Sequence, residues 1–504
     1  MRPWPDPSRV NGEPLDVLIV GAGFSGLCLA IRLREAGLRF KVLEQADRVG
    51  GTWRDNVYPG AACDVPSDLY CFSFAPRPDN SRRYPGQAEL QAYLEHCADR
   101  FGVRDHLRLG CTVREARFDP VAFHWRVRVD GDEREWLARS LVIATGGLSR
   151  PRWPDIPGLT EFRGERVHSA RWRPLPDGPG IRIGVIGTGA SAIQIVPSLA
   201  RGQVELAVFQ RTPAWVLPKR DPRVPAWRQR AYRRWPWLQK AARGVLRVAL
   251  ETRGLAFTRA PWLLRAARPV FEFFLRRQVH DPVLRAALRP DYVPGCKRVL
   301  LSNDYLAAFD RGRATLVTSP IRRVVAEGIE TADGVLHRLD AIVACTGFEA
   351  AEAGVPFPVH GREGRELNAQ WREGAQAYRG TQVSGFPNLF LMTGPNTGLG
   401  HTSVLLMIEA QAAFILRRLH ALAGRVGQAM DVRAAAQADY NAWLQRRLAG
   451  TVWNTGGCRS WYLTGAGLNT TLWPGTTPAF ERLLRRPDPQ AIEFIGPEKK
   501  VPPP

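Results

Sequence analysis

Two short apolar runs that each lead directly into a glycine-rich turn constrain the fold of this chain more than any other feature. The first run, residues 16–20, precedes the turn GAGFSG at residues 21–26, a helical pattern that ends at Gly37, and a second apolar run at residues 40–43. Apolar runs of this length are typical of buried parallel strands. The order of strand, glycine turn, helix and strand predicts the βαβ unit of a dinucleotide-binding fold.

The residues of the first turn suit this function. Gly21 allows the tight turn, Gly23 lets the backbone approach a pyrophosphate, and Gly26 lets the helix pack closely on the strand. The helix start offers free N–H groups and a partial positive charge to phosphates. Glu44 directly follows the second strand, where a carboxylate accepts hydrogen bonds from a ribose. The pattern therefore predicts a nucleotide-binding site.

A second copy of the pattern begins at residue 181. A strand-like run precedes the turn GTGASA at residues 187–192, and a helical pattern to about residue 200 and an apolar run at residues 204–209 follow it. This internal duplication predicts two nucleotide-binding units in one chain.

The end of the second unit differs from the end of the first, because Arg211 and Thr212 stand where an acid would be expected. A carboxylate repels the 2′-phosphate of NADPH, whereas a guanidinium can grip it with two hydrogen bonds. One unit with an acid and one with an arginine indicate that the chain binds FAD and NADPH together. The plainer alternative for Arg211 is that it is one of many surface arginines.

Two further strand-like runs, residues 141–147 and 341–348, end in similar turns and bracket the second unit. We therefore expect an α/β fold with two Rossmann-like domains, in which the NADPH domain is inserted into the FAD domain. A helical insertion is expected at about residues 220–290, where strand-like patterns are absent. The predicted divisions are 1–150 for the first part of the FAD-binding domain, 151–340 for the NADPH-binding domain, and 341–504 for the return to the FAD-binding domain and the C-terminal segment.

The chain is strongly basic, with a formal net charge of +22. Residues 219–289 hold eighteen Lys and Arg against four acidic residues, interleaved with four tryptophans. Such helices either close over a substrate pocket or lie in a membrane interface, and both alternatives stay open. A nucleic-acid partner is not expected, because no matching fold accompanies the basic residues. A genome rich in G and C is a further explanation for the abundant arginine.

The eight cysteines are scattered and form no C-x-x-C pair, so neither a redox dithiol nor a zinc ribbon is indicated, and a disulfide reductase is disfavoured. We expect no metal site. Single cysteines fit a reducing compartment, and Cys296 is interpreted as a passive small residue. Residues 1–14 have no apolar export segment, and no apolar run approaches the roughly 20 residues that cross a bilayer. The protein is therefore predicted to be cytoplasmic, with a disordered tail at residues 499–504.

Four stretches of the chain carry a family resemblance. GGTWRDNVYPGAACD at residues 50–64 and FRGERVHSARW at residues 162–172 resemble the two signatures of type I Baeyer–Villiger monooxygenases. GCKR at residues 295–298 stands where that family carries its lysine–arginine pair, and GPNTG follows at residues 394–398. With both glycine turns, the resemblance covers nearly the whole chain. Related N- and S-oxygenating flavin enzymes carry Tyr or Phe in place of Trp172, so this tryptophan favours the ketone-oxidising branch.

The resemblance implies an enzyme that binds FAD and NADPH and uses O2 to insert one oxygen atom next to a ketone carbonyl. A C4a-peroxyflavin would attack the ketone and yield an ester or a lactone. Two alternatives stay open: oxygenation at sulfur or nitrogen, and a peripheral membrane flavoprotein whose role is binding or electron supply. The implied partners are O2 and a small-molecule substrate, with a ketone expected.

By this resemblance, Arg298 is the catalytic cation. A fixed positive charge beside the flavin would lower the pKa of the peroxide and stabilise the alkoxide that develops on the carbonyl oxygen. Asp64, as an ionised partner, would hold the guanidinium in place.

The resemblance also implies cofactor contacts. Lys297 would meet the NADPH phosphate together with Arg211, Trp53 would pack beside the flavin, and Trp461 would contact the nicotinamide cofactor. His168 is interpreted as a hydrogen-bonded structural residue in a linker rather than as an acid or base. The other cofactor-binding residues that the resemblance implies are Ser25, Thr52, Asp64, Tyr70, Val113, Gly187, Thr188, Gly189, Ser191 and Thr212.

Overall fold

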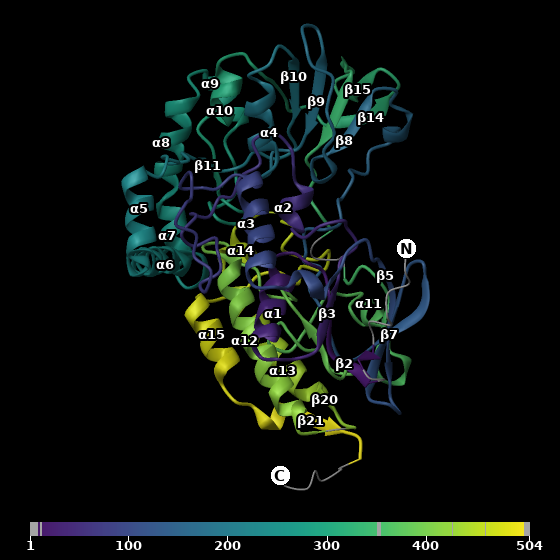
Figure 1. Ribbon diagram of the computed structural model, residues 1–504. Helices are drawn as coiled ribbons and strands as arrows, with labels where there is room; N and C mark the ends of the chain where they lie inside the picture. Colours follow the sequence, from purple (N-terminus) through teal and green to yellow (C-terminus); the bar gives the residue numbers. More distant parts are fainter. Residues whose placement is uncertain (1–8, 11–12, 350–353, 426, 459, 498–504) are drawn as a thin grey trace.

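Two sheets with helices packed against them organise the chain in the computed structural model (Figure 1). The structure describes residues 9–10, 13–349, 354–425, 427–458 and 460–497. The predicted α/β class with two Rossmann-like units is confirmed. The tail whose disorder was predicted, residues 499–504, lies outside the described residues.

The first sheet has nine strands, and one of them leads into the first glycine turn. Its strands are β1 (Arg9–Val10), β2 (Glu13–Val20), β3 (Phe40–Leu43), β4 (Leu107–Arg108), β5 (Val113–Asp119), β6 (His124–Val129), β7 (Asp132–Ile143), β18 (Val359–His360) and β19 (Leu389–Leu391). They follow the order β18-β5-β6-β7-β2-β3-β4, with β1 on β2 and β19 on β7. Successive residues of β2 point to opposite faces, so Val17 and Ile19 enter one core while Leu18 and Val20 enter another.

Three helices contribute to the core on the Val17 side of this sheet: α1 (Phe24–Glu35), α3 (Gln87–Arg100) and α12 (Val404–Ala423). Helix α1 begins inside the glycine turn and ends where the pattern predicted. Gly37 follows it with φ +69°, a left-handed conformation that glycine adopts freely at a helix end. The turn is therefore held between a buried strand and a buried helix.

The second sheet is fully parallel and carries the second glycine turn. In spatial order its strands are β13 (Thr315–Val317), β10 (Glu205–Phe209), β9 (Arg182–Ile186), β17 (Ala341–Ala344) and β8 (Glu165–His168). Helices α4 (Ala192–Leu199) and α10 (Tyr305–Asp310) pack against it. A three-stranded antiparallel sheet lies next in the chain, with β14 (Ile321–Val325), β15 (Gly328–Thr331) and β16 (Leu336–Arg338).

The chain leaves the first sheet after β7 and returns to it with β18 and β19. Strand β17 still belongs to the second sheet, although the predicted division at residue 341 assigned it to the returning part. Its residues pair with both β8 and β9, and such pairing between distant segments is not readable from a single apolar run.

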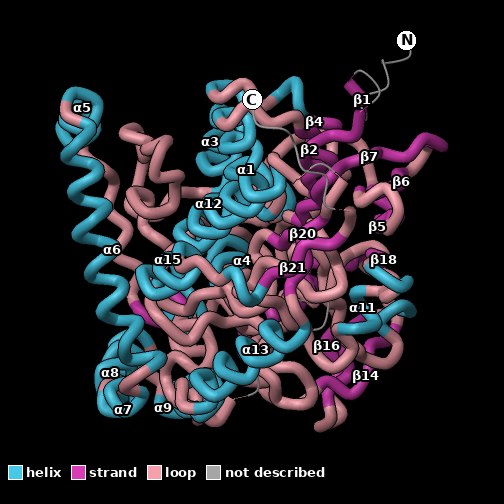
Figure 2. The backbone as a smooth tube through the Cα atoms, turned by 90° about the horizontal axis from the view of Figure 1, so that it is seen from below, coloured by secondary structure: helices cyan, strands magenta, loops and turns pink. Residues whose placement is uncertain are grey.

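Residues 226–287 form a layer of helices, as the pattern predicted. They are α5 (Ala226–Arg234), α6 (Pro236–Thr258), α7 (Pro261–Ala266), α8 (Arg268–Gln278) and α9 (Pro282–Ala287). Proline stands in the first turn of each of the last four, where its missing N–H costs nothing and its φ suits a helix. Figure 2 shows α6 running along one side of the molecule, with α7 and α8 at its end. Within the described chain, every helix is too short or too polar to cross a bilayer.

The C-terminal part packs on the first unit. It contains α13 (Ala434–Ala449), α14 (Val452–Thr455), α15 (Thr477–Arg485) and an antiparallel strand pair, β20 (Ala429–Val432) and β21 (Ile492–Ile495). Their apolar residues form a core that also takes residues of α12 and the α6–α7 region. This core links the C-terminus to the helical layer.

Candidate active site

A single cavity of about 2020 Å³ brings both glycine turns together with the segments of the family signatures. Pockets for one drug-sized ligand usually have about 300–1,000 Å³, so this cavity has room for two dinucleotides and a substrate. Of the predicted catalytic and cofactor-binding residues, Gly26 alone does not line it, because it packs behind the first turn.

Two positions of the first turn have no room for a side chain. A Cβ atom on Gly26 would lie 1.9 Å from the carbonyl oxygen of Gly21, and one on Gly21 would lie 2.6 Å from that of Ala144. Gly21 also has φ +106°, which side chains rarely tolerate. No side chain caps the start of α1, and Gly23 and Ser25 line the cavity. The helix start is therefore open toward the cavity, as a bound pyrophosphate requires.

Glu44 lies at the end of β3, as predicted, and its carboxylate is buried. Its Oε2 accepts the N–H of Ala22 at 2.8 Å, and its Oε1 accepts Nη1 of Arg54 at 2.9 Å. The carboxylate thus ties the end of β3 to the glycine turn while it lines the cavity.

The second turn repeats this geometry. Gly187 has φ +111°, and a Cβ on it would lie 2.6 Å from the carbonyl oxygen of Cys345. Gly189 faces open space, and Ser191 stands at the uncapped start of α4. The hydroxyl of Thr188 donates to the carbonyl of Thr212 at 2.7 Å, which links the turn to the end of the second unit.

Two cations from distant parts of the chain meet beside this second turn. Burial lowers the pKa of Lys297, and the positive charge of Arg211 lowers it further. The Lys297 ammonium lies 5.1 Å from the centre of the Tyr292 ring. Neither cation forms an ion pair with a carboxylate among the described residues. The negative charge of Asp291 opposes this shift in the pKa of Lys297. Two neighbouring cations without an ion-pair partner among the described residues suit a phosphate dianion, as the 2′-phosphate prediction requires.

Arg298 and Asp64 form a bidentate ion pair, although 234 positions separate them in the chain. Nε of Arg298 lies 2.6 Å from Oδ2, and Nη2 lies 2.8 Å from Oδ1. Nη1 donates to the carbonyl of Leu399 at 3.4 Å. The Asp64 loop is held in place by Gln194 of α4, whose Nε2 donates to the carbonyl of Ala62 at 2.9 Å.

Arg298 is positioned by a short parallel strand pair. It precedes β12 (Leu300–Leu301), which pairs with β11 (Val216–Leu217). The two side chains of the ion pair are 31% and 30% exposed, and both line the cavity. A guanidinium has five N–H donors, and three are engaged here, so two stay available to a group in the cavity.

The charges of this pair are mutually fixed. Burial would raise the pKa of Asp64, but the Arg298 guanidinium and its hydrogen bonds overcome that effect and lower the pKa below its usual value. The Asp64 carboxylate in turn raises the pKa of Arg298. Asp64 is therefore ionised at neutral pH, and Arg298 carries a permanent charge.

Aromatic side chains form another wall. Nε1 of Trp53 donates to the hydroxyl of Tyr70 at 3.1 Å, and the two rings meet edge to face at 5.7 Å. Trp53 lies on α2 (Thr52–Asp55), and Gln87 donates to its carbonyl. Thr52 and Val113, the first residue of β5, line the cavity beside them.

The segment that follows α14 in the chain forms another part of the cavity wall. Trp461 is 49% exposed and lines the cavity, and its neighbour Tyr462 is buried next to Arg298. Tyr462 was missed in the sequence, as was Lys219, whose charge also acts on Asp64. Neither residue belongs to a signature stretch, so no local pattern identifies them.

The interpretation of Cys296 as a passive residue was wrong. Cys296 forms a disulfide with Cys458, 162 positions away. The bridge joins the residue before Lys297 to the segment that leads to Trp461. Absence of a C-x-x-C pair does not exclude such a bridge, since distant cysteines meet only in the folded chain. The other six cysteines are buried and free.

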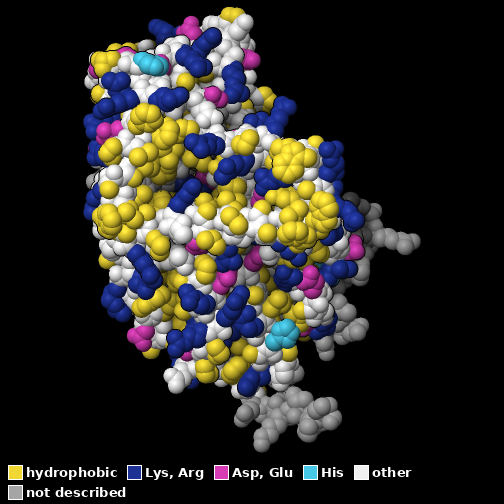
Figure 3. Space-filling model, turned by 90° about the vertical axis from the view of Figure 1, so that its left-hand side faces the viewer, with side chains coloured by type: hydrophobic (Ala, Val, Ile, Leu, Met, Phe, Trp, Pro, Cys, Tyr) yellow, Lys and Arg dark blue, Asp and Glu magenta, His cyan; other side chains and the backbone are white. Residues whose placement is uncertain are grey.

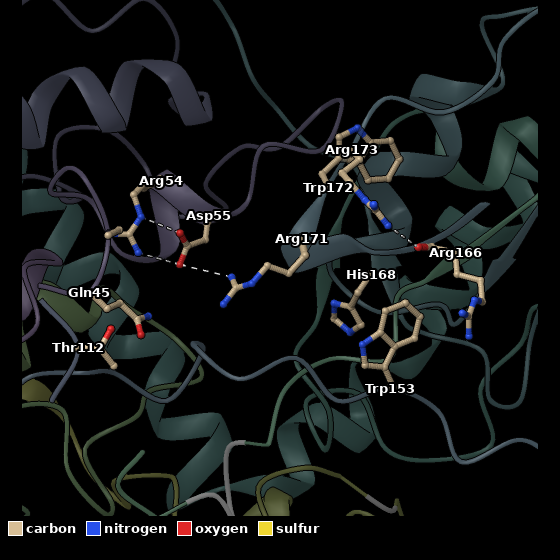
Figure 4. Close-up of a pocket in the computed structure, with 11 residues that line it drawn as sticks. Gln45, Arg54, Asp55, Thr112, Trp153, Arg166, His168, Arg171, Trp172 and Arg173 are labelled. Atoms are coloured by element: carbon tan, nitrogen blue, oxygen red, sulfur yellow. Dashed lines mark hydrogen bonds and ion pairs between the residues drawn. The ribbon is translucent and has the colours of Figure 1, made fainter. Parts of the chain in front are cut away.

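The signature stretch at residues 162–172 lines a second cavity of about 640 Å³, which adjoins the first and shares lining residues with it (Figure 4). His168, at the end of β8, is buried, and its Nδ1 accepts the N–H of Ala170 at 3.1 Å. Its ring meets Trp153 edge to face at 5.5 Å, and burial lowers its pKa. Arg171 points the other way, toward Asp55, at 3.7 Å. This arrangement supports a structural role for His168 between the two units.

Comparisons with known proteins agree with this geometry. The family model described as flavin-binding monooxygenase-like matches residues 15–229. A Baeyer–Villiger monooxygenase of Streptomyces coelicolor is 45% identical over 490 residues, which cover 96% of this chain and 93% of the relative. A solved structure of OTEMO in complex with FAD and NADP is 28% identical with a TM-score of 0.85 and covers 95% of this chain and 99% of that one. An oxidised steroid monooxygenase bound to NADP is 32% identical with a TM-score of 0.82, over 93% of this chain and 96% of that one.

Proposed function

The chain belongs to the Baeyer–Villiger monooxygenases, and from that premise we propose which of its residues perform the reaction. The protein is an FAD- and NADPH-dependent monooxygenase that uses O2 to insert one oxygen atom next to a ketone carbonyl, giving an ester or a lactone. The assignment of residues rests on the Arg298–Asp64 ion pair, whose two side chains line the same cavity as both glycine turns.

The chain offers a separate holding site for each cofactor. When bound, NADPH supplies electrons and FAD supplies the redox centre at which dioxygen is activated. The turn at residues 21–26 and the helix start of α1 would hold the pyrophosphate of FAD, with Glu44 near its ribose. The turn at residues 187–192 would hold that of NADPH, and Arg211 and Lys297 would bind its 2′-phosphate.

The guanidinium of Arg298 stays positively charged, because the Asp64 carboxylate raises its pKa. Its two free N–H groups can donate to the carbonyl oxygen of a ketone in the cavity. As that oxygen gains negative charge, a donor that is already oriented stabilises it without reorganisation. The positive charge of Arg298 would also lower the pKa of the oxygen nucleophile that attacks the ketone. That nucleophile must stay deprotonated to react.

Asp64 acts on the reaction through Arg298. Its two oxygens fix the guanidinium plane, because a bidentate pair restrains rotation more than a single hydrogen bond does. It also compensates part of the buried charge, so that the guanidinium stays in the cavity wall rather than turning toward solvent. Asp64 is thus a positioning residue in this proposal.

A ketone panel tests the proposed function. Purified FAD-loaded enzyme should consume NADPH and form esters or lactones from ketones, with hydrogen peroxide counted separately. Sulfides and amines are offered in parallel, and sulfoxides or N-oxides as the only products, with no ester from any ketone, would contradict ketone oxidation and favour oxygenation at sulfur or nitrogen.

A further inference from the structure

The outward side of helix α6 is apolar, although no part of the described chain covers it. Trp237, Val245 and Val248 are 63%, 73% and 64% exposed, and Ala241 and Leu255 are exposed on the same side. The spacings of four, four, three and seven residues place all five on one face of an α-helix. An amphipathic helix on a soluble protein normally turns charged residues to this side.

The inward side of α6 carries polar residues as well as the leucines that pack on the body of the protein. Gln239, Arg243, Arg247 and Glu251 recur every fourth residue and bond to the body of the protein. Arg247, for example, donates to a Glu481 carboxylate oxygen at 2.6 Å. The helix is therefore fixed in this orientation by specific contacts, and its apolar side stays outward.

The neighbouring helices extend this apolar face, which we name the α5–α8 face. Figure 3 looks onto this side of the molecule and shows hydrophobic side chains gathered on it, with Lys and Arg among and around them. The further exposed apolar residues of these helices are Trp227, Trp235, Trp262, Leu263, Val270 and Phe273. Apolar residues in such number on one surface indicate an interaction site.

The charge of this segment is one-sided. Eighteen Lys and Arg stand against four acidic residues between positions 219 and 289. Several exposed cations have no ion-pair partner within the described part of the chain: Arg230, Arg234, Lys240, Arg253, Arg259, Arg265, Arg276 and Arg277. The partner of this surface must therefore be both apolar and negatively charged.

We propose that the α5–α8 face docks on the surface of an anionic lipid bilayer. Tryptophan prefers the boundary between lipid headgroups and acyl chains, and arginine pairs with lipid phosphates. Helices of this composition lie in the plane of the interface with their apolar side inserted. A second copy of this chain fits poorly, because a symmetric contact would set the excess positive charge of one segment against that of the other.

The docking face lies close to the reaction residues. Leu246 and Leu250, also on α6, pack against a small core that contains Cys63 and Val65. These two residues flank Asp64, so one helix separates the bilayer from the loop that carries it. The docking inference goes beyond the proposed oxygenation and does not depend on it.

Vesicle sedimentation of the FAD-loaded enzyme tests the proposal. The wild type should pellet at low salt with vesicles of equal parts phosphatidylcholine and phosphatidylglycerol, and it should stay in solution with phosphatidylcholine alone. High salt should release it, because the lipid phosphates are then screened. Failure to pellet with the anionic vesicles at low salt would overturn the proposal.

Two sets of variants locate the contact. Replacing Trp237, Val245 and Val248 together by Ser should weaken vesicle binding on the order of 100-fold, from the apolar area lost. Replacing Lys240, Arg259 and Arg265 together by Gln should weaken it by roughly 100-fold as well, since each cation near a membrane contributes about fivefold.

Matched controls carry the same changes elsewhere on the surface. They are Val121→Ser with Val335→Ser, which are exposed outside the α5–α8 face, and Arg311→Gln with Arg313→Gln and Arg338→Gln. Bound FAD and NADPH oxidation without vesicles show whether each variant is folded. Vesicle binding equal to that of the controls in both variant sets would contradict the assignment of this face. A dimer that dissociates only in the Trp237 set, without vesicle binding by the wild type, would make a second copy the occupant and would overturn the proposal.

Discussion

At the scale of single residues, the proposed reaction depends on side chains that the fold keeps ionised. Asp64 and Arg298 stabilise each other's ionised forms through two short hydrogen bonds. Lys297 and Arg211 are brought close, and among the described residues neither forms an ion pair with a carboxylate, so a bound anion would relieve their mutual repulsion. We make a separate prediction for the Arg298–Asp64 pair and for the pair of Lys297 and Arg211.

Arg298→Ala should separate cofactor reduction from oxygen transfer. The variant should still oxidise NADPH but release hydrogen peroxide, and ester formation should fall by about 10²–10³-fold or more, because a preorganised charge is lost. The measurement is product formation against peroxide at matched NADPH consumption. Arg298→Lys serves as the conservative control, since it keeps the charge but loses the bidentate contact. Ester formation at the wild-type rate in Arg298→Ala would contradict the assignment.

Arg211→Ala and Lys297→Ala should each raise KM for NADPH. A hydrogen bond to a charged group contributes about 1.5–3 kcal/mol, which corresponds to roughly 10–100-fold. KM for NADH, which has no 2′-phosphate, should hardly change, so the preference for NADPH should fall by the same factor. Arg313→Ala, an exposed arginine of the same unit, is the control. An Arg211 that is only a surface arginine would leave both KM values unchanged.

At the scale of elements, the first glycine turn brings a strand and a helix so close that no side chain fits at Gly21 or Gly26. A Cβ on Gly26 would lie 1.9 Å from the carbonyl oxygen of Gly21. Gly21 directly follows the strand, and Gly26 lies in the helix. Neither can move without shifting β2 or α1, whose residues are buried in the same core. The phosphate site and the stability of the first unit are thus linked.

Gly26→Ala should therefore impair FAD retention and stability together. The overpacking should cost about 3 kcal/mol, and the helix start should move away from the phosphate position. Thermal unfolding and the FAD content after gel filtration measure the two effects. Gly244→Ala in α6 is the matched control, since a Cβ there meets no atom within 4 Å, and it should be neutral or stabilising by up to about 1 kcal/mol. Full FAD content and unchanged stability in Gly26→Ala would show that the turn can widen.

At the scale of the whole molecule, one ion pair joins segments that belong to different parts of the chain. Asp64 lies in the first unit, and Arg298 follows the helical layer of residues 226–287. The disulfide between Cys296 and Cys458 connects the same region to the C-terminal part. The ion pair and Cys458 line the same cavity as the two glycine turns.

The ion pair predicts how stability depends on pH. The folded-state pKa of Asp64 is lowered, so its contribution is fully present above the unfolded carboxyl pKa of about 3.9 and is lost as the pH falls through the folded-state pKa. The wild type should therefore be more stable than Asp64→Asn at pH 7, and the difference should shrink as the pH drops below about 4. Urea unfolding at several pH values measures it. A difference that stays constant with pH would show that the Asp64 charge does not stabilise the fold.

Much of the fold was predictable because its signals are local. The strand at Phe40–Leu43 and the helix that begins in the first turn have the predicted positions. Strand β7, in contrast, begins nine residues before the predicted run, at Asp132 rather than 141. Its first part pairs with β6 and includes the exposed charged residues Glu133 and Arg134, so it lacks the continuous apolar run of a buried parallel strand.

The sequence by itself determined two nucleotide turns, their cofactor types and the family, because a glycine conformation, a helix start and a charge after a strand are properties of a few adjacent residues. Only the tertiary structure decided the bidentate geometry of the Arg298–Asp64 pair that the resemblance implied, that Cys296 meets Cys458 and that α6 turns an apolar side outward. The reason is physical: contacts across 234 and 162 positions depend on how the two sheets and the helical layer pack. A helix whose two sides both carry apolar residues does not reveal its orientation until its neighbours bind one of them.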